Sequence, residues 1–362
     1  MDQVSLRTIG ADGYESAIQS FVAYTFPMVD LGNKVTTLEN VMTAIISSGQ
    51  LRYGPAPNPK SLVAMRAVGR DCISQDRPIP ILVPFGSRKA VIDGTLDVAE
   101  LMAIRQLASL QDRIRKCYTP GAQMVVRVED TTGDFLFSLE PRSLDSVAST
   151  RKYCDSLVRL AAVLGFDTPE SGLMIRRESQ MFSMESLAAA VETIEPTLTE
   201  FLQGNTPAFS KLTKMGWAGR IPEEQREYYY TRYRAADPHI SSDQQIKQLA
   251  RYFACAWARI QLSGTGAMPH WNHQFLKLAF CPPVPGAPTN LVDRTVYYRT
   301  VPLKLAQTHM PAWRAKGYLA IGDTYAVPKL ASWREEKDYI IARTELSDGE
   351  QSVEVQTDFV VV

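Results

Sequence analysis

The sequence has no long apolar run and no excess of charge of either sign. None of its hydrophobic stretches approaches the roughly 20 residues that a helix needs to cross a bilayer, which argues against an integral membrane protein. Lysine plus arginine equals aspartate plus glutamate at 39 each, so no global field attracts nucleic acid or an anionic membrane, although a local basic patch stays allowed. We therefore expect no membrane partner, and nucleic acid is not a favoured partner.

Cysteine is scarce and shows no pairing pattern. The five cysteines are an odd number, lie far apart and form no CxxC pair. No secretory hydrophobic segment opens the chain. Reduced thiols in a cytoplasmic protein are therefore the expectation.

Several common catalytic and cofactor motifs are also missing. There is no Gly-x-Ser-x-Gly elbow and no cysteine in an activating context, which argues against a nucleophilic triad. Residues 263–266 form only a short glycine turn, without the strand–GxGxxG–helix order of a dinucleotide site. We therefore expect neither NAD nor Walker-type ATP binding.

What the chain does have is a strand–helix–strand pattern over residues 79–130. Residues 79–84 and 124–128 are short, rich in Ile and Val, and bounded by Pro and Gly, which is typical of buried parallel strands. The segment between them has apolar residues at helical spacing, with most polar residues on other faces. The apolar set is Leu101, Ile104, Leu107, Ala108 and Ile114, and the polar set is Glu100, Arg105, Gln106, Asp112, Arg113 and Lys116.

Charged residues follow each predicted strand. Parallel strands joined by one helix cross over in the right-handed sense, so their carboxyl ends meet at one edge, where open α/β sheets bind ligands. Ser87, Arg88 and Lys89 follow the first strand, and Glu129 and Asp130 follow the second. A cationic loop therefore faces an acidic one. If the chain instead continues as a hairpin, Glu129 and Asp130 are ordinary strand and turn residues, and Lys89 has the alternative of a solvated loop lysine.

The remaining segments organise around this unit. We predict a helical N-terminal cap over 1–78, a Rossmann-like α/β core with a helical connection over 79–240, and a helix plus a β-rich C-terminal subdomain over 241–362. The core is a mostly parallel sheet flanked by helices, with a third strand at 173–175 followed by Arg176, Arg177, Glu178 and Ser179. The C-terminal strands either extend this sheet or form an accessory unit. Predicted helices cover 14–24, 36–49, 60–75, 143–164, 183–203 and 242–261, and further strands cover 275–280, 296–298, 318–321, 339–342 and 353–361.

Residues 214–239 interleave aromatic and basic side chains. Trp217, three consecutive tyrosines and several arginines could stack bases or sugar rings. The alternative is a surface helix whose aromatic rings dock on the core. Nucleic-acid binding here would depend on salt and would centre on Arg220, Arg226, Arg232 and Arg234.

Histidines cluster in residues 268–277, MPHWNHQFLK. A His-x-x-His metal site needs both rings on one face and at least one further ligand. Pro269 and the alternating residues that follow favour a loop entering a strand, so no metal is predicted. General acid or base, hydrogen bonding to a ligand, and packing stay open for His270 and His273. His309 lies in a loop-like segment and either closes the site or is a surface histidine.

Five segments match, in order, those of a known family. They are PFGSRK after a strand, GTLDVAEL opening a helix, YTPGAQMVV leading into the second strand, and further on YCDSLVRLAAVLG and QLARYFACAWARIQLSG. In these pieces the chain resembles the isocyanide (isonitrile) synthases of the dityrosine and pyoverdine-cluster type. The resemblance covers about residues 79–165 and 243–321.

This resemblance implies a reaction between a free α-amino acid and a pentulose phosphate such as ribulose 5-phosphate. The sugar carbonyl condenses with the amine and donates one carbon, which gives an isonitrile without a metal or other cofactor. The reaction needs cationic groups for phosphate and carboxylate and a general acid or base. We expect Lys89 and Arg88 to bind the phosphate or the carboxylate, and Asp130 or Glu129 to transfer protons. The other candidates are His270 and His309 for catalysis, and Ser87, Arg176, Arg177, Arg259, His273 and Lys277 for substrate binding.

Two other classes of function stay open. One is a transferase that joins an amino acid or amine to a phosphate-activated acceptor, including a nucleobase or DNA, with the same grips. The other is a non-catalytic descendant that only binds a metabolite. Binding of pentulose phosphate without turnover would favour the second class.

Overall fold

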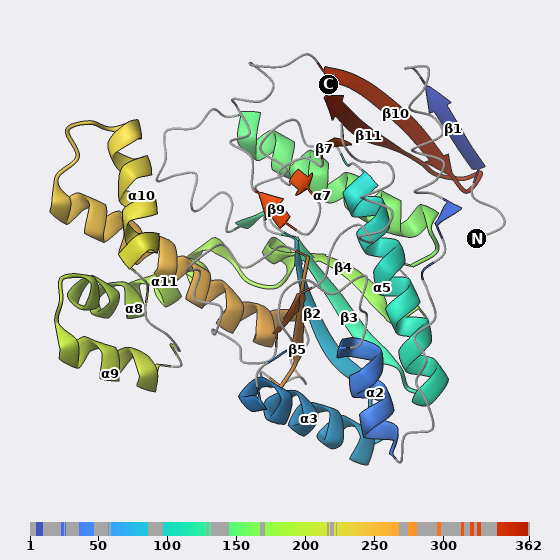
Figure 1. The fold of residues 1–362 in the computed structure, drawn as a ribbon, viewed down its shortest axis with the longest axis horizontal. Coiled ribbons are helices and arrows are strands. Elements are labelled where there is room, and N and C mark those ends of the chain that lie inside the picture. Colours follow the sequence, from blue (N-terminus) through green and yellow to red (C-terminus); the bar gives the residue numbers. More distant parts are fainter. Residues whose placement is uncertain are drawn as a thin grey trace.

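The centre of the molecule is a five-stranded sheet with the order β4-β3-β2-β5-β6 (Figure 1). Its strands are β2 (Ile79–Phe85), β3 (Ala122–Val128), β4 (Leu173–Arg177), β5 (Leu276–Ala279) and β6 (Thr295–Tyr297). Every pairing is parallel. The computed structural model describes residues 5–9, 23–24, 26, 36–46, 57, 59–85, 96, 98–128, 130–131, 145–166, 171–215, 217, 221, 223–267, 274–280, 295–297, 313–314, 319–321, 324–326 and 339–360.

The strand order confirms the predicted Rossmann-like α/β core. Taken along the chain, the sheet runs third, second, first, fourth, fifth, which is the order of a doubly wound dinucleotide-binding sheet. The order reverses between β2 and β5. In open α/β sheets ligands bind outside the carboxyl ends of the strands at this switch point.

One side of the sheet, here called the apolar face, holds most of the core. Side chains alternate along a strand, and the register places Ile81, Val83, Val126 and Ile175 on this face. Helices α5 (Val98–Cys117) and α7 (Asp145–Val163) connect β2 to β3 and β3 to β4, and α2 (Thr37–Ile46) and α3 (Pro59–Ser74) join the same core cluster. These helices follow the predicted ones closely. The helix predicted at 14–24 lies largely outside the described residues.

Several polar residues of α5 are buried, although they lie away from the apolar stripe of the helix. Glu100, Arg105, Gln106 and Arg113 are buried, whereas Asp112 and Lys116 are exposed. The reason is that α5 is enclosed by α2, α7, β3 and a C-terminal strand. Tyr153 of α7 donates a hydrogen bond to Glu100 at 3.3 Å, and Arg105 donates to the Tyr24 carbonyl oxygen at 2.7 Å.

A buried glutamine fastens α5 to the start of β3. The Gln111 amide donates to the Ala122 carbonyl oxygen at 2.7 Å and accepts from the Ala122 N–H at 2.8 Å. Gly172, just before β4, has a φ of +69°, and a Cβ there would lie 2.3 Å from the Gln111 Nε2 and 2.6 Å from the Ala122 carbonyl oxygen. A residue larger than glycine would therefore displace this contact.

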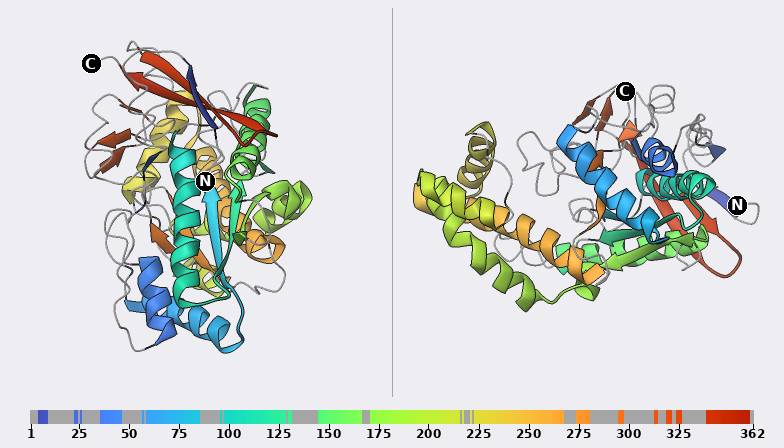
Figure 2. Two further views of the ribbon diagram at one scale, coloured as in Figure 1. Left: turned by 90° about the vertical axis from the view of Figure 1, so that its right-hand side faces the viewer. Right: turned by 90° about the horizontal axis from the view of Figure 1, so that it is seen from below.

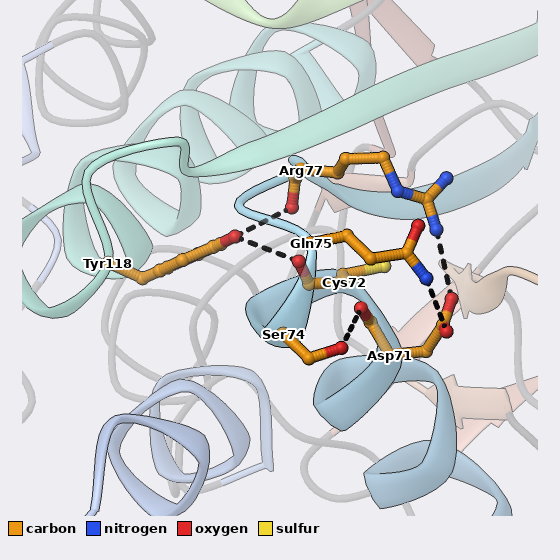
Figure 3. A network of polar contacts seen from close by, with 6 residues as sticks. All are labelled: Asp71, Cys72, Ser74, Gln75, Arg77 and Tyr118. Carbon is orange, nitrogen blue, oxygen red and sulfur yellow. Dashed lines mark hydrogen bonds and ion pairs between the residues drawn. The ribbon is translucent and has the colours of Figure 1, made fainter.

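The joint between α3 and β2 is a polar network (Figure 3). The Tyr118 hydroxyl donates to the carbonyl oxygens of Cys72 at 3.2 Å and Arg77 at 2.9 Å. Asp71 accepts from Gln75 at 2.8 Å and from Arg77 at 2.9 Å. Burial raises the pKa of the Cys72 thiol to about 11, so this thiol is neutral at physiological pH.

A second hydrophobic cluster is mostly helical. It comprises α8 (Met184–Leu202), α9 (Thr206–Lys214), α10 (Glu223–Ala236) and α11 (Ser242–Ala267), which lie to one side of the sheet (Figure 2). Ser183 caps α8 by accepting from the Ser186 N–H at 3.1 Å. The helices predicted at 183–203 and 242–261 are confirmed, although α11 ends later than predicted.

The aromatic residues of the basic segment pack inside this second cluster. The Tyr229 ring lies 4.8 Å from that of Tyr252 and 5.9 Å from that of Phe253, measured between centroids, and Trp217 is 1% exposed. Arg234 forms an ion pair with Glu227. This is the docking alternative, in which the rings serve the core of the helical cluster.

The C-terminal strands follow both alternatives left open by the sequence. Strands β5 and β6 extend the parallel sheet, whereas β10 (Tyr339–Ser347) and β11 (Ser352–Val360) belong to a four-stranded antiparallel sheet of order β1-β10-β11-β7. Its other members are β7 (Trp313–Arg314) and β1 (Ser5–Ile9), a strand that the predicted helical cap did not include. Strands β8 (Leu319–Ile321) and β9 (Thr324–Ala326) form a separate pair.

The antiparallel sheet packs on α5 and α7 through Leu346, Val353 and Val355, which belong to the main core. The domain boundaries at residues 78 and 240 stay predictions. Within the described ranges, no helix is both long and apolar enough to cross a membrane.

Candidate functional site

The predicted site residues divide into two groups. Asp130, Arg176, Arg177, Arg259 and Lys277 lie in segments that the structure describes. Outside the described residues lie Ser87, Arg88, Lys89, Glu129, His270, His273 and His309, whose roles stay predictions. Among the described residues, no group of three or more His, Cys, Asp or Glu side chains could hold a metal ion.

Asp130 lies just past the end of β3 and is 9% exposed. Its Oδ1 accepts from the Thr131 N–H at 2.8 Å and from the Ser179 N–H at 2.9 Å, and its Oδ2 accepts from the Ser179 hydroxyl at 2.5 Å. These donors are all neutral. The carboxylate is therefore fixed in one orientation by the residues at the end of β4.

The turn that follows β4 is held at each of its residues. In η2 (Glu178–Gln180), the Glu178 carboxylate forms an ion pair with Arg127 of β3, with 3.3 Å between Oε1 and Nε and without the alignment of a hydrogen bond. The two side chains are 0% and 2% exposed. Gln180 accepts from the Arg177 N–H at 2.9 Å. Ser179 is thus positioned by a turn that the ion pair between Glu178 and Arg127 fastens to β3.

The side of the sheet opposite the apolar face carries the basic residues, and we call it the charged face. Arg127 and Arg176 are register partners in β3 and β4, and Lys277 of β5 pairs with Leu82 of β2, which lies on the same face as Val125. The structure therefore brings Arg176 and Lys277 to one face. A small apolar cluster of Leu82, Val125 and Phe275 lies on this face, with Met174 and Met181 packed against it.

Arg176 and Arg177 are neighbours in sequence but face opposite ways. Arg177 lies on the apolar side of the alternation and forms an ion pair with Asp155 of α7. Arg176 is half-buried, and its guanidinium donates to the Ile175 carbonyl oxygen at 3.0 Å and to the Met174 Sδ at 3.6 Å. Among the described residues, no carboxylate pairs with Arg176. We therefore leave Arg177 out of the site and keep Arg176 in it.

Two stacked phenylalanine rings lie at the switch point between β2 and β5. Phe85 ends β2 and Phe280 follows β5, and their rings stack with centroids 5.9 Å apart and planes inclined by 4°. Both are buried. Among the described residues, the charged groups of this edge come from the ends of β3 and β4, whereas Lys277 lies on the charged face beside Leu82 in the middle of β2. Arg259 is half-buried on α11.

Three residues of this edge were not predicted, namely Arg127, Glu178 and Ser179. Arg127 interrupts the apolar run of β3, and a charged residue inside a buried strand is costly unless it is paired. That interruption is the signal that could have identified it. Glu178 and Ser179 follow β4, which is the same position after a strand that pointed to Asp130.

The chain matches no protein-family model and no curated protein sequence. Three solved structures are similar at low identity. The PvcA protein from Pseudomonas aeruginosa shares 15% identity over 84% of this chain and 96% of its own length, with a TM-score of 0.47. AlbC, a cyclodipeptide synthase from Streptomyces noursei, shares 12% over 64% and 100%, with a TM-score of 0.33.

Tryptophanyl-tRNA synthetase from Plasmodium falciparum shares 10% identity over 81% of this chain and 65% of its own length, with a TM-score of 0.37. Scores at this level do not establish a shared activity. The fold assignment therefore rests on the strand order and pairing of this chain.

Proposed function

We propose that the chain is an enzyme that binds anionic small molecules at the carboxyl edge of its parallel sheet. The observation that carries the proposal is the half-buried Arg176 guanidinium, which has only a backbone carbonyl and a thioether as acceptors among the described residues. A charge removed from water without an ionic partner is costly to stability. An anionic ligand at the edge where such sheets bind their substrates would offset that cost.

The specific reaction that we propose is the condensation of a free α-amino acid with a pentulose phosphate such as ribulose 5-phosphate, with an isonitrile as product. The sequence resemblance to the isocyanide synthases supports this reaction. It needs two anion grips and a group that moves protons. Ser87, Arg88 and Lys89 follow β2 at the switch point, so we assign them to the phosphate. Asp130, fixed beside Ser179, is the proton-transfer candidate together with Glu129.

The remaining predicted residues keep subordinate roles in this proposal. His270 and His309 are further acid–base candidates, and His273, Lys277 and Arg259 are further substrate contacts. A transferase acting on nucleic acid receives less support, because Tyr229 and Trp217 are used in packing rather than left as stacking surfaces.

The test is incubation of the purified protein with a panel of amino acids and ribulose 5-phosphate labelled at C2. We expect a product with one labelled carbon added on nitrogen, detected by mass and by isonitrile trapping. Inertness across the panel together with amine transfer to an activated nucleotide or DNA base would replace the proposal with the transferase. Binding of ribulose 5-phosphate without turnover of any amino acid would indicate a metabolite-binding protein.

A single substitution tests the assigned phosphate grip. Lys89→Ala should abolish turnover while leaving the melting temperature nearly unchanged, because a loop charge contributes little to stability. A large fall in melting temperature would instead make Lys89 a structural residue.

A further inference from the structure

The charged groups at the ends of β3 and β4 do not all neutralise one another. Arg127 and Glu178 form one ion pair inside the protein, and Arg177 and Asp155 form another on the apolar face. Within the described residues, Arg176 is then left without a carboxylate partner, and Asp130 is left without a cationic one. The edge therefore presents one positive and one negative group.

These two groups lie at the ends of neighbouring strands. Arg176 is the register partner of Arg127; Asp130 comes three residues after Arg127 and Ser179 three residues after Arg176, both past the strand ends. Three residues span at most about 10 Å of chain. Asp130 and Ser179 are in hydrogen-bond contact, so the Asp130 carboxylate lies beside a residue that is three positions after Arg176 in the chain. They form no ion pair with each other.

A ligand that carries both a carboxylate and an ammonium group matches this arrangement. We propose that the ends of β3 and β4 hold the α-amino acid, with its carboxylate on Arg176 and its ammonium group on the Asp130 Oδ2 and the Ser179 hydroxyl. This assignment rests on the proposed function, because it names the subsite for one of the two substrates. It separates that subsite from the β2 loop that we assign to phosphate.

The protein has a donor for the ligand's carboxylate in Arg176 and acceptors for its ammonium group in Asp130 and Ser179. The Arg176 guanidinium now donates to a carbonyl oxygen and a sulfur atom, which are weak partners for a cation. A carboxylate would replace them with charge-assisted bonds and can bind in a bidentate manner. On the other side Ser179 is exposed, whereas Asp130 is nearly buried. The ammonium group would therefore approach through Ser179.

The subsite is also rigid, which favours binding. The hydrogen bonds from Thr131 and Ser179 fix the Asp130 carboxylate, and the Arg127–Glu178 pair and the Gln180 contact hold the turn that carries Ser179. A preorganised site loses less conformational freedom when a ligand binds. Arg127 and Glu178 thus act as positioning residues without touching the ligand.

The experiment is calorimetric titration of the protein with free amino acids in the absence of any sugar phosphate. For the amino acid that binds best, we expect Arg176→Met to weaken the Kd by about 10- to 100-fold, as for loss of a charged hydrogen-bonding partner. Ser179→Ala should weaken it less. Arg177→Met is the matched control, and it should leave the Kd unchanged. An equal loss in both arginine variants would overturn the assignment.

Ligand analogues test the same point in the unmodified protein. The amide of that amino acid lacks the carboxylate and its N-acetyl derivative lacks the ammonium group, so both should bind at least about 10-fold more weakly. Arg176→Met should not weaken the binding of the amide further. Equal affinity for the amide and the free amino acid would contradict a carboxylate contact with Arg176.

Turnover with ribulose 5-phosphate, measured in parallel, separates this assignment from the proposed reaction. Binding of an amino acid through Arg176 without turnover would uphold the subsite and overturn the condensation. Turnover that Arg176→Met does not impair would uphold the reaction and overturn the subsite. Failure of every amino acid to bind at millimolar concentration would overturn the subsite as well.

Discussion

The two faces of the parallel sheet are made from the same strands and serve different purposes. On the apolar face, Ile81, Val126 and Ile175 pack under the helices and are at most 2% exposed. On the charged face, alternate residues of the same strands include Arg127 and Arg176. A change of one position along a strand therefore separates the hydrophobic core from the proposed ligand site.

This difference shows how the protein combines stability with binding. Burial of apolar side chains is the main favourable contribution to folding, and the apolar face supplies it. Charges on the other face are removed from water at a cost, which Arg127 offsets by pairing with Glu178. Arg176 has no such partner among the described residues, and we propose that the ligand takes that place.

Breaking the buried ion pair should have the largest effect on stability. Glu178→Leu removes the carboxylate beside Arg127, and we expect a loss of about 3 to 5 kcal/mol in the free energy of unfolding. Urea titration followed by circular dichroism measures it. The double variant Arg127→Met with Glu178→Leu should lie within about 1 kcal/mol of the parent, because both charges of the pair are then removed together. A double variant less stable than the single one would contradict this account.

A polar contact beneath the apolar face should cost less and leave binding intact. Gln111→Ala leaves the N–H and carbonyl groups of Ala122 without the amide that contacts both, and we expect a loss of about 1 to 3 kcal/mol. The affinity for amino acids should not change, because α5 contacts β3 far from the carboxyl edge. Loss of binding in a folded Gln111→Ala protein would contradict the view that the apolar face does not contribute to ligand binding.

The buried Cys72 thiol should make stability fall at alkaline pH. Its pKa is raised by burial from 9.0 to about 11, so the unfolded chain releases this proton first. The stability is fully present below pH 9 and is lost as the pH rises through about 11. At pH 10 we expect a loss of about 1 kcal/mol relative to pH 8.

Cys72→Ala is the control for that pH dependence. Burial raises the pKa of Tyr118 in both proteins, and the nearby Cys72 thiol raises it further in the parent only, so the comparison measures the thiol together with its effect on Tyr118. Denaturant titrations at pH 8 and pH 10 should therefore show a steeper decline in the parent than in the variant. Parallel declines would mean that the thiol is not protected in the folded state.

Replacing either of the two adjacent arginines should change stability only slightly, whereas only the replacement of Arg176 should weaken binding. Arg177→Met removes an ion pair whose side chains are 34% and 47% exposed, which should cost below about 1 kcal/mol. Arg176→Met removes no ion pair in the described residues and should change stability by about 0.5 kcal/mol or less. Thermal melts of both variants measure this. A large destabilisation by Arg176→Met would make that residue structural.

Local patterns were sufficient to predict most of the parallel sheet and its helices. The runs at 79–84, 124–128 and 173–175 became β2, β3 and β4, because Ile and Val between Pro and Gly boundaries favour short buried strands. The same reasoning placed Asp130 directly after β3. The burial of several polar residues of α5 could not be predicted, since helical periodicity does not show that several elements enclose one helix.

Non-local contacts were beyond such patterns. Strand β1 pairs with β10 from the other end of the chain, and its short sequence does not distinguish it from a loop. Helix α10 has charged and aromatic residues without a clear apolar stripe, and its form depends on packing against α11. Neither the Arg127–Glu178 contact nor the Asp130–Ser179 contact can be seen in one strand alone.

The sequence by itself determined the alternation of strands and helices and the presence of charged residues after each strand, because periodicity and chain-breaking residues act over a few positions. Only the tertiary structure decided which charges meet. Strand register places Arg127 beside Arg176, alternation turns Arg177 away to Asp155, and the turn after β4 brings Ser179 to Asp130. These are distances between separate strands, and such distances exist only once the sheet has formed.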